Sequence, residues 1–379
     1  MGLDNRAPTA EEQAQMNAMV EQGMKDGAVG LSTGLIYVPG TFAKTEEVVE
    51  LAKSASKYGG TYASHIRDEG TEVVKAIEEA INIGEQAKMP VEISHFKISS
   101  KALWGESAKT IGLVKAARLR GLAVTIDQYA YTASSTSLDS RVPSWVIAGG
   151  REEGRKRLAD PATRKKVVNE MKDDLKKKEF KDFSFAYVAS YQANPEFNGK
   201  NIVEITRMVK NKKKLDSQIE QILDMYEKGG AQMVYRVMSE DDVQNIMREP
   251  FTMIASDSGV RQFGSGVPHP RGYGNNARVL GKYVRELKVI SLEDAIRKMT
   301  SLPAQTFGLR ERGQIREGFA ADLVIFDDSK VTDKATFDAP HQYAEGFSSV
   351  IVNGAIVFDG IKMTGAMSGR PLFGNGLTK

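Results

Sequence analysis

The sequence predicts an α/β fold of the (β/α)-barrel type, and three observations support this. Short runs of β-branched and apolar residues recur about every 30 residues, the length of one strand-plus-helix unit. Helical stretches fill the gaps between these runs. Two runs, TYASH and VEISH, end on His65 and His95, which lie 30 residues apart. In a barrel, the carboxyl tips of the strands meet at one mouth, where the functional groups gather.

The first third of the chain alternates strand and helix. Strands are expected at 28–32, 61–66, 91–96 and 123–129. A capping box formed by Thr9 and Glu12 begins the first helix, whose methionines are expected to pack in the core. A later helix is marked by Val73, Ile77 and Ile81 on one face.

The rhythm changes after about residue 144. A mostly helical, charged insertion is expected from about 144 to 250, with one apolar run at 183–188. A strand returns at 251–256 and is followed by Asp257. Beyond Gly308 the chain becomes β-rich, with strands at 321–326, 348–352 and 355–358, the last two joined by the hairpin signal Asn353-Gly354. The sequence thus predicts a barrel portion over 1–308 and a C-terminal β-rich segment over 309–379.

Composition excludes several classes of function. The chain has 379 residues, of which 41% are hydrophobic and 27% charged, as in ordinary soluble globular proteins. A net charge of +3 does not favour nucleic acid or an anionic membrane as a partner. With no cysteine, the chain has neither disulfides nor thiolate metal ligands. No apolar run is long enough to span a membrane and no signal-like segment is present, so the compartment, cytoplasmic or periplasmic, stays open.

Three polar residues end three of the expected strands: His65, His95 and Asp257. Two imidazoles and a carboxylate can hold a divalent metal and its water, and the carboxylate can also transfer a proton. Alternatively, both histidines bond to backbone at the edge of the core. The matching positions of two of only four histidines favour metal ligation.

Seven motifs carry a resemblance to a known family. They occur in the family's order: GAVGLSTGLIYVPG, YASHIRDEG, ISHFK, DQYAYTASST, ASDSG, HPRGYG and GFAADLVIFD. From Arg6 onward the chain resembles the N-acyl-D-amino-acid deacylases, or D-aminoacylases, of the amidohydrolase superfamily. The resemblance implies a partial TIM-type barrel comprising strands four to eight, with a residual β-sandwich segment at the C-terminus. It also implies a metal-dependent hydrolase that cleaves a small-molecule N-acyl-D-amino acid to a D-amino acid and a carboxylate.

The same resemblance implies the metal chemistry. His65 and His95 would ligate zinc, with Asp257 beside the metal as a further ligand and the catalytic carboxylate. One tightly bound ion is expected, and a second, weaker site is possible. Tyr37 and Lys97 would polarise the scissile carbonyl and stabilise the developing oxyanion.

Substrate binding is assigned in the same way. Tyr129, Ser135 and Arg271 would contact the substrate, with Arg271 gripping the α-carboxylate through its two-pronged guanidinium. Tyr37 and Ser135 have an alternative as plain loop residues. Of the other two histidines, His269 is expected to shape its loop and His341 to lie on the surface.

The chain also departs from the family pattern. The first three barrel strands, a His-x-His pair and a bridging ligand that is commonly Cys are not found, so the chain is expected to be a fragment with a truncated N-terminus. Five strands would leave open sheet edges that favour association. One alternative is therefore an inactive barrel that serves as an association module, and a cyclic-amide hydrolase is another.

A serine hydrolase is a further alternative. The sequence around Ser32, GLSTG, matches the nucleophile-elbow pattern G-x-S-x-G, and Asp257 followed by His269 or His341 keeps the usual order of the triad. The elbow requires a helix directly after its second glycine, whereas this chain continues with a Pro39-Gly40 turn signal.

Overall fold

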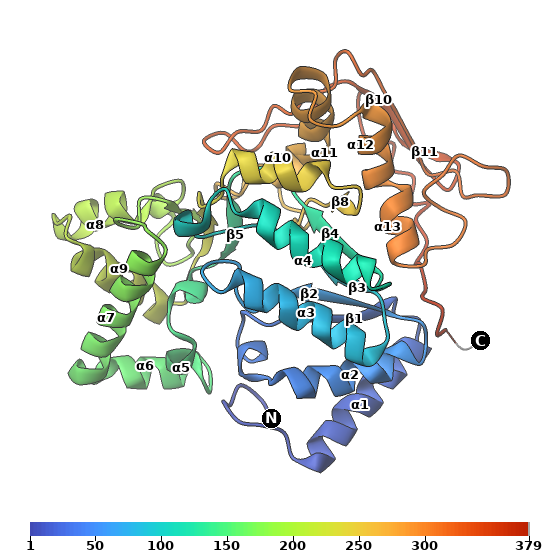
Figure 1. Cartoon of the computed structure of the whole chain (residues 1–379). Coiled ribbons are helices and arrows are strands. Elements are labelled where there is room, and N and C mark those ends of the chain that lie inside the picture. The colour runs from blue at the N-terminus through green and yellow to red at the C-terminus, as the bar shows by residue number, and fades with distance from the viewer. Residues whose placement is uncertain (378–379) are drawn as a thin grey trace.

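The computed structural model describes residues 1–377, and its centre is a parallel sheet of five strands (Figure 1). Their order in the sheet is β1-β2-β3-β4-β8. Their bounds are β1 Gly30–Gly34, β2 Thr61–His65, β3 Val91–Ile93, β4 Val124–Gln128 and β8 Thr252–Ile254. The fold is α/β with parallel strands, as the sequence predicts. All five expected strands form, each shifted or shortened by a few residues.

The sheet is open. β1 and β8 stand at its two edges, and within residues 1–377 they do not pair with each other. The structure therefore contains five parallel strands and their helices but not a closed barrel. Each edge strand has a strand neighbour on only one side, but the two edges differ in exposure. β1 is partly exposed, whereas β8 is fully buried beside the helix Leu292–Met299, whose Lys298 ammonium donates to the Thr252 carbonyl at 3.2 Å.

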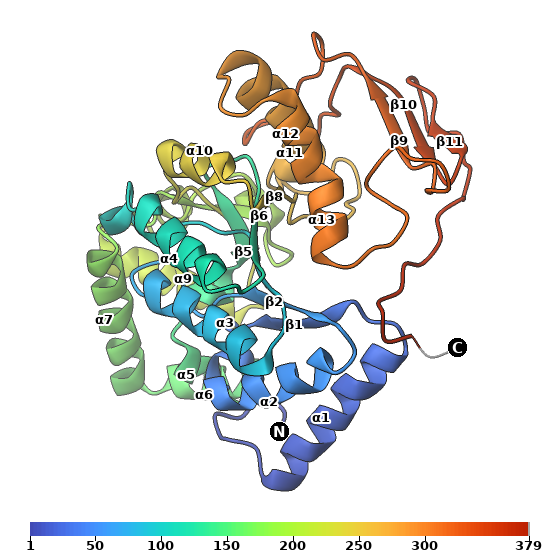
Figure 2. The same ribbon diagram turned by 45° about the vertical axis from the view of Figure 1, so that its right-hand side comes forward.

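Four helices lie one beside the next along the sheet, as both ribbon views show (Figures 1 and 2). They are α1 Ala10–Lys25, α2 Thr45–Ser56, α3 Val73–Ala87 and α4 Ser107–Leu119. The capping box between Thr9 and Glu12 begins α1 as expected. On α3, Val73, Ile77 and Ala80 face inward and are almost fully buried. Together with the strands, these helices enclose one of the apolar clusters of the core.

The segment between β4 and β8 is more mixed than the sequence indicates. It contains the helices α5 Ser144–Ile147, α6 Arg151–Ala159, α7 Pro161–Lys177, α8 Ile202–Lys210, α9 Leu215–Glu227 and α10 Glu240–Arg248. It also contains an antiparallel sheet in the order β5-β7-β6, formed by β5 Ser134–Ser137, β6 Ala186–Ser190 and β7 Gln232–Tyr235. β6 includes part of the apolar run expected at 183–188. β7 reads QMVY, a short apolar run, whereas β5 reads SSTS and carries no strand pattern.

After β8 the chain forms α11 Arg271–Arg278, a π-helical stretch Val279–Glu286, α12 Leu292–Met299 and α13 Ser301–Thr306. The C-terminal antiparallel sheet follows, with β9 Leu323–Phe326, β10 Phe347–Val352 and β11 Ala355–Phe358. Asn353 and Gly354 join β10 to β11 with positive φ angles of 47° and 82°, which confirms the expected hairpin. Short 3₁₀ turns occur at Gly40–Phe42, Lys101–Leu103, Leu138–Arg141 and Pro195–Phe197.

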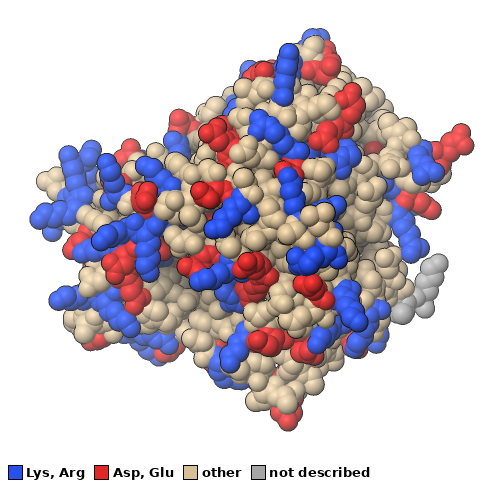
Figure 3. Space-filling view, in the orientation of Figure 1, with Lys and Arg blue, Asp and Glu red and all other residues tan. Residues whose placement is uncertain are grey.

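The surface carries both signs of charge. On the face shown in Figure 3, Lys and Arg side chains are interspersed with Asp and Glu, also over the insertion at the left of the view. Within residues 1–377, no helix combines the length and the apolar character that crossing a membrane requires.

Candidate active site

His65 is the last residue of β2, so its side chain projects from the carboxyl tip of a buried strand. Its side chain is 17% exposed, and its Nε2 atom is buried without a hydrogen-bond partner among the described residues. Burial lowers the pKa of His65 to about 3, so the imidazole is neutral near pH 7. A neutral imidazole with an unused ring nitrogen is suited to ligating a metal.

His95 lies two residues beyond the end of β3, with a left-handed backbone (φ 41°). Its backbone N–H donates to Oδ1 of Asp127 at 2.7 Å, which fixes this unusual turn. The turn brings the two imidazoles edge to face, with ring centroids 4.3 Å apart. Two strand tips thus deliver two histidines to one point, as their spacing predicts.

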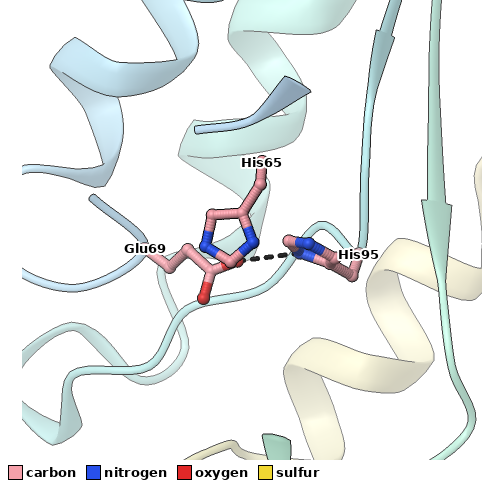
Figure 4. Close-up of side chains that lie close together, drawn as sticks. All are labelled: His65, Glu69 and His95. Atoms are coloured by element: carbon pink, nitrogen blue, oxygen red, sulfur yellow. Dashed lines mark ion pairs between the residues drawn. The ribbon is translucent and has the colours of Figure 1, made fainter. Parts of the chain in front are cut away.

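Glu69 completes a group that sequence reasoning missed. Its Oε1 atom lies 2.8 Å from Nδ1 of His95 and 3.7 Å from Nε2 of His65 (Figure 4). The three residues offer ligand atoms that all lie within 4.8 Å of one another, a spacing that suits a bound cation. Glu69 follows His65 by four residues in the motif HIRDEG, but in a loop this spacing does not indicate a shared face.

Lys97 neutralises Glu69. Its buried ammonium donates to Oε1 of Glu69 in a very short contact, and also to the carbonyl oxygen of His95 at 2.7 Å. Burial opposes the charge on Glu69, but Lys97 and the two imidazoles outweigh it and hold the pKa of this carboxyl well below its ordinary range. Burial likewise opposes the charge on Lys97, and Glu69 outweighs it, so the pKa of Lys97 is raised. The pair is therefore fully ionised near pH 7.

The ammonium of Lys97 also lies 2.8 Å from Nδ1 of His95. A metal that used both Glu69 Oε1 and this nitrogen would compete with Lys97 for them. His65 Nε2 has no such competitor among the described residues. The donor set of two imidazoles and a carboxylate matches what zinc accepts in proteins, so the residues fit a zinc-like ion.

Two tyrosines contact this group, Tyr37 at His65 and Tyr129 at Lys97. The Tyr37 ring stands 4.7 Å from that of His65, and its hydroxyl is 2.9 Å from Oγ1 of Thr136. The Tyr129 ring is buried beneath two cations, the Lys97 ammonium at 5.6 Å and the Arg271 guanidinium at 4.4 Å. Burial raises the pKa of both phenols, so both keep their protons and can donate hydrogen bonds.

Asp257 and Arg271 form an ion pair beside the group. Asp257 follows β8 in a left-handed conformation (φ 48°), and its Oδ2 lies 2.9 Å from Nη1 of Arg271. The contact lacks the alignment of a hydrogen bond, so this buried nitrogen keeps its donor capacity unused. Asp257 shares the cavity with the histidines but lies outside the group formed by His65, Glu69 and His95. Arg271 begins α11 and is 5% exposed.

A small cavity of about 90 Å³ joins these residues. Seven of the eight residues singled out from the sequence line it: Tyr37, His65, His95, Lys97, Tyr129, Ser135 and Asp257. Arg271 lies just behind it, against Asp257. The Ser135 hydroxyl donates to the Met233 carbonyl at 2.8 Å within the β5-β7-β6 sheet. A larger chamber of about 570 Å³, walled partly by α5 and α7, adjoins the cavity and shares Tyr37 with it.

The other two histidines have structural partners. His269 is buried, with Nε2 2.9 Å from the Ala133 carbonyl and Nδ1 accepting from the Arg271 backbone N–H at 3.0 Å. Its place as a loop-shaping residue agrees with the sequence. His341 differs from expectation, because it is half-buried and contacts the loop that follows Asp257 rather than only solvent.

A parallel α/β sheet with two histidines and acidic groups at its strand tips is typical of metal-dependent hydrolases, and the comparisons identify the family. Residues 203–358 match the model of the amidohydrolase family. A D-aminoacylase of Alcaligenes xylosoxydans xylosoxydans is 37% identical over 367 residues, which are 97% of this chain and 66% of that protein.

Two solved structures agree with this. A D-aminoacylase with a binuclear metal centre is 35% identical, with a TM-score of 0.78 over 97% of this chain and 68% of its own. The N-acyl-D-glutamate deacylase of Bordetella bronchiseptica, complexed with zinc and a phosphonate inhibitor, is 32% identical, with a TM-score of 0.77 over 97% of this chain and 67% of its own. The chain belongs to the amidohydrolase family, in the group of the D-aminoacylases and N-acyl-D-amino-acid deacylases. It spans 66% of the length of the curated D-aminoacylase that it matches.

Proposed function

We propose that this chain carries the active site of a zinc-dependent deacylase, which hydrolyses N-acyl-D-amino acids to a D-amino acid and a carboxylate. The observation that supports this proposal most directly is the group formed by His65, Glu69 and His95. In this group the buried Nε2 atom of His65 has no hydrogen-bond partner among the described residues. The relatives support the substrate class, since they are D-aminoacylases and N-acyl-D-amino-acid deacylases.

In this proposal His65, His95 and Glu69 hold the metal. When bound, zinc would act as a Lewis acid and would lower the pKa of a water molecule at this site to about 7. The neutral state of His65 favours binding, because a ligating imidazole must have lost its proton. Asp257 is predicted as a further ligand or as a neighbour of the metal.

The remaining steps fall to side chains around the cavity. Asp257 takes the proton of the attacking water and passes it to the departing amine. Tyr37 donates a hydrogen bond to the developing oxyanion, and a donor so placed contributes roughly 3 kcal/mol of transition-state stabilisation. The Lys97 ammonium, which contacts Glu69 Oε1, the His95 carbonyl and His95 Nδ1, becomes a second donor where a metal takes over Glu69 and His95. The Nη1 atom of Arg271, which has no hydrogen-bond partner among the described residues, binds the α-carboxylate of the substrate. The same guanidinium holds Asp257 in place through their ion pair.

The structure does not provide the groups that the serine-hydrolase alternative requires. Ser32 lies exposed on the edge strand β1, and no helix follows directly after Gly34. Both ring nitrogens of His269 and of His341 are engaged by other groups. Neither histidine is therefore available as the general base that the Ser32 hydroxyl would need.

The test is a deacetylation assay on the purified chain with added zinc, using N-acetyl-D- and N-acetyl-L-amino acids in parallel. We expect turnover of the D-enantiomers only, and its loss in Asp257→Asn. Ser32→Ala is the matched control and should change nothing. No turnover of any N-acyl-D-amino acid by well-folded, zinc-loaded protein would favour the inactive-barrel alternative, and hydrolysis of cyclic amides instead would favour that class.

A further inference from the structure

We propose that His341 is a positioning residue that clamps the loop between Asp257 and Arg271. This loop, residues 258–270, has no helix or strand and connects the two members of the ion pair beside the cavity. The consequence for catalysis rests on the proposed function, but the clamp itself does not. His341 comes from the C-terminal segment, between β9 and β10.

The imidazole of His341 contacts the loop through both ring nitrogens. The backbone N–H of Gly264 donates to Nδ1 at 3.1 Å, and Nε2 lies 3.0 Å from the carbonyl oxygen of Gly266. A single tautomer, with the proton on Nε2, satisfies both contacts. The Tyr273 hydroxyl lies 2.9 Å from Nδ1 and shares the lone pair of this nitrogen with the Gly264 N–H, which ties α11 to the clamp.

The loop has few other anchors. Within residues 1–377, the backbone of residues 258–266 makes hydrogen bonds to residues outside that stretch only through His341. The next anchor is Val267, whose N–H donates to the Ala189 carbonyl at 2.8 Å. The two bonds to His341 therefore hold a stretch that nothing else in its backbone fixes.

Ring contacts reinforce the clamp. Phe263, at the middle of the loop, has its centroid 5.4 Å from that of His341 and stacks on Tyr343 at 5.2 Å. Tyr273 lies 5.5 Å from His341 in an edge-to-face arrangement. Phe263 nevertheless remains 52% exposed, so apolar burial alone holds the loop only weakly.

The clamp has a defined effect on the site. Asp257 directly precedes the loop and has a left-handed backbone, which aspartate tolerates better than most residues but which still costs free energy without a supporting structure. Arg271 is held independently, through its backbone bond to His269 and its place in α11. Loss of the clamp should therefore displace the Asp257 carboxylate more than the Arg271 guanidinium, and lower kcat more than it raises KM.

The primary test is limited proteolysis, which requires no activity. Arg261 is exposed in the loop and offers trypsin a cleavage site. His341→Leu removes both polar contacts and should speed cleavage after Arg261 about tenfold, since each lost hydrogen bond raises the open fraction several-fold. His341→Gln keeps one acceptor and one donor and should restore much of the protection. Gln342→Ala is the matched control, because this side chain bonds to Ala339 within its own segment.

Cleavage at the wild-type rate in His341→Leu, at an unchanged melting temperature, would overturn the proposal. So would an equal acceleration in the Gln342→Ala control. If the chain turns over N-acetyl-D-amino acids, His341→Leu should lower kcat about tenfold and leave KM within about twofold of the wild type. His341→Gln should recover most of the lost kcat. If the chain shows no turnover, the proposed function fails while proteolysis still decides the clamp.

Discussion

Replacing Glu69 by Gln tests whether a buried ion pair organises the site. Glu69 is 8% exposed and Lys97 only 4%. Glu69→Gln keeps the shape of the side chain but leaves the Lys97 ammonium in the protein interior without its counter-charge. Removing one member of a buried pair costs about 3–5 kcal/mol of unfolding free energy, because the other charge loses its compensation. We expect a loss in this range, large against the 5–15 kcal/mol that stabilises a typical domain.

The double variant Glu69→Gln/Lys97→Met separates this effect from a general loss of packing. Methionine fills a similar volume without charge, so the double variant should recover most of the stability lost in Glu69→Gln. Urea unfolding of the wild type, of Glu69→Gln, of Lys97→Met and of the double variant gives the coupling energy between the two side chains directly. A loss below about 1 kcal/mol in Glu69→Gln, or losses that simply add, would refute a tightly coupled buried pair.

The pH dependence of stability gives the same pair a second signature. The folded pKa of Glu69 lies well below the ordinary value of 4.5. Its stabilising contribution is therefore present above the unfolded pKa, and it is lost as the pH falls toward the folded value. The wild type should lose stability over this acidic range, and Glu69→Gln should show a weaker dependence there. Parallel acid titrations of the two proteins would count against the assignment.

Three other outcomes follow from the site and from the sheet edges. His65→Ala and His95→Ala should each greatly reduce the zinc retained after dialysis, whereas Asp257→Asn should keep most of the zinc and lose turnover. Equal zinc in the wild type and all three variants, measured by elemental analysis, would contradict the ligand assignment. Arg271→Lys should lose most of the preference for free-acid over amide substrates, measured as a ratio of kcat/KM, because an ammonium cannot make the two-pronged contact. The chain should associate through the open edge of β1, and Ser32→Lys on this strand should shift size-exclusion profiles toward the monomer; identical profiles would show that this edge is not used.

The sequence predicted the positions of the strands well and their ends less well. The expected strand at 91–96 ends in the structure at Ile93, and the one at 251–256 ends at Ile254. In both cases a candidate site residue just beyond, His95 or Asp257, has a left-handed backbone that stops the extended conformation. Apolar patterning does not report such a turn, because the residues before it read as strand.

Neither Glu69 nor the β5-β7-β6 sheet was identified from the sequence, for different reasons. Glu69 lies in a loop, where no periodicity identifies an inward-facing carboxylate, and only the structure brings it to His95. Strand β5 is entirely polar and pairs across a long insertion with β7, so its formation depends on tertiary contacts rather than on local propensity. The clustering of residues on the parallel strands was predictable because strand tips converge.

The left-handed backbones at His95 and Asp257 limit how this site can be redesigned. Only glycine adopts such a backbone freely, and Asn, Asp and His tolerate it better than other side chains. A β-branched or bulky replacement at either position would strain the main chain before its chemistry mattered. Library design at these two positions should therefore be confined to Gly, Asn, Asp and His, whereas at Lys97 and Tyr37, whose φ angles are not positive, the backbone itself sets no such limit.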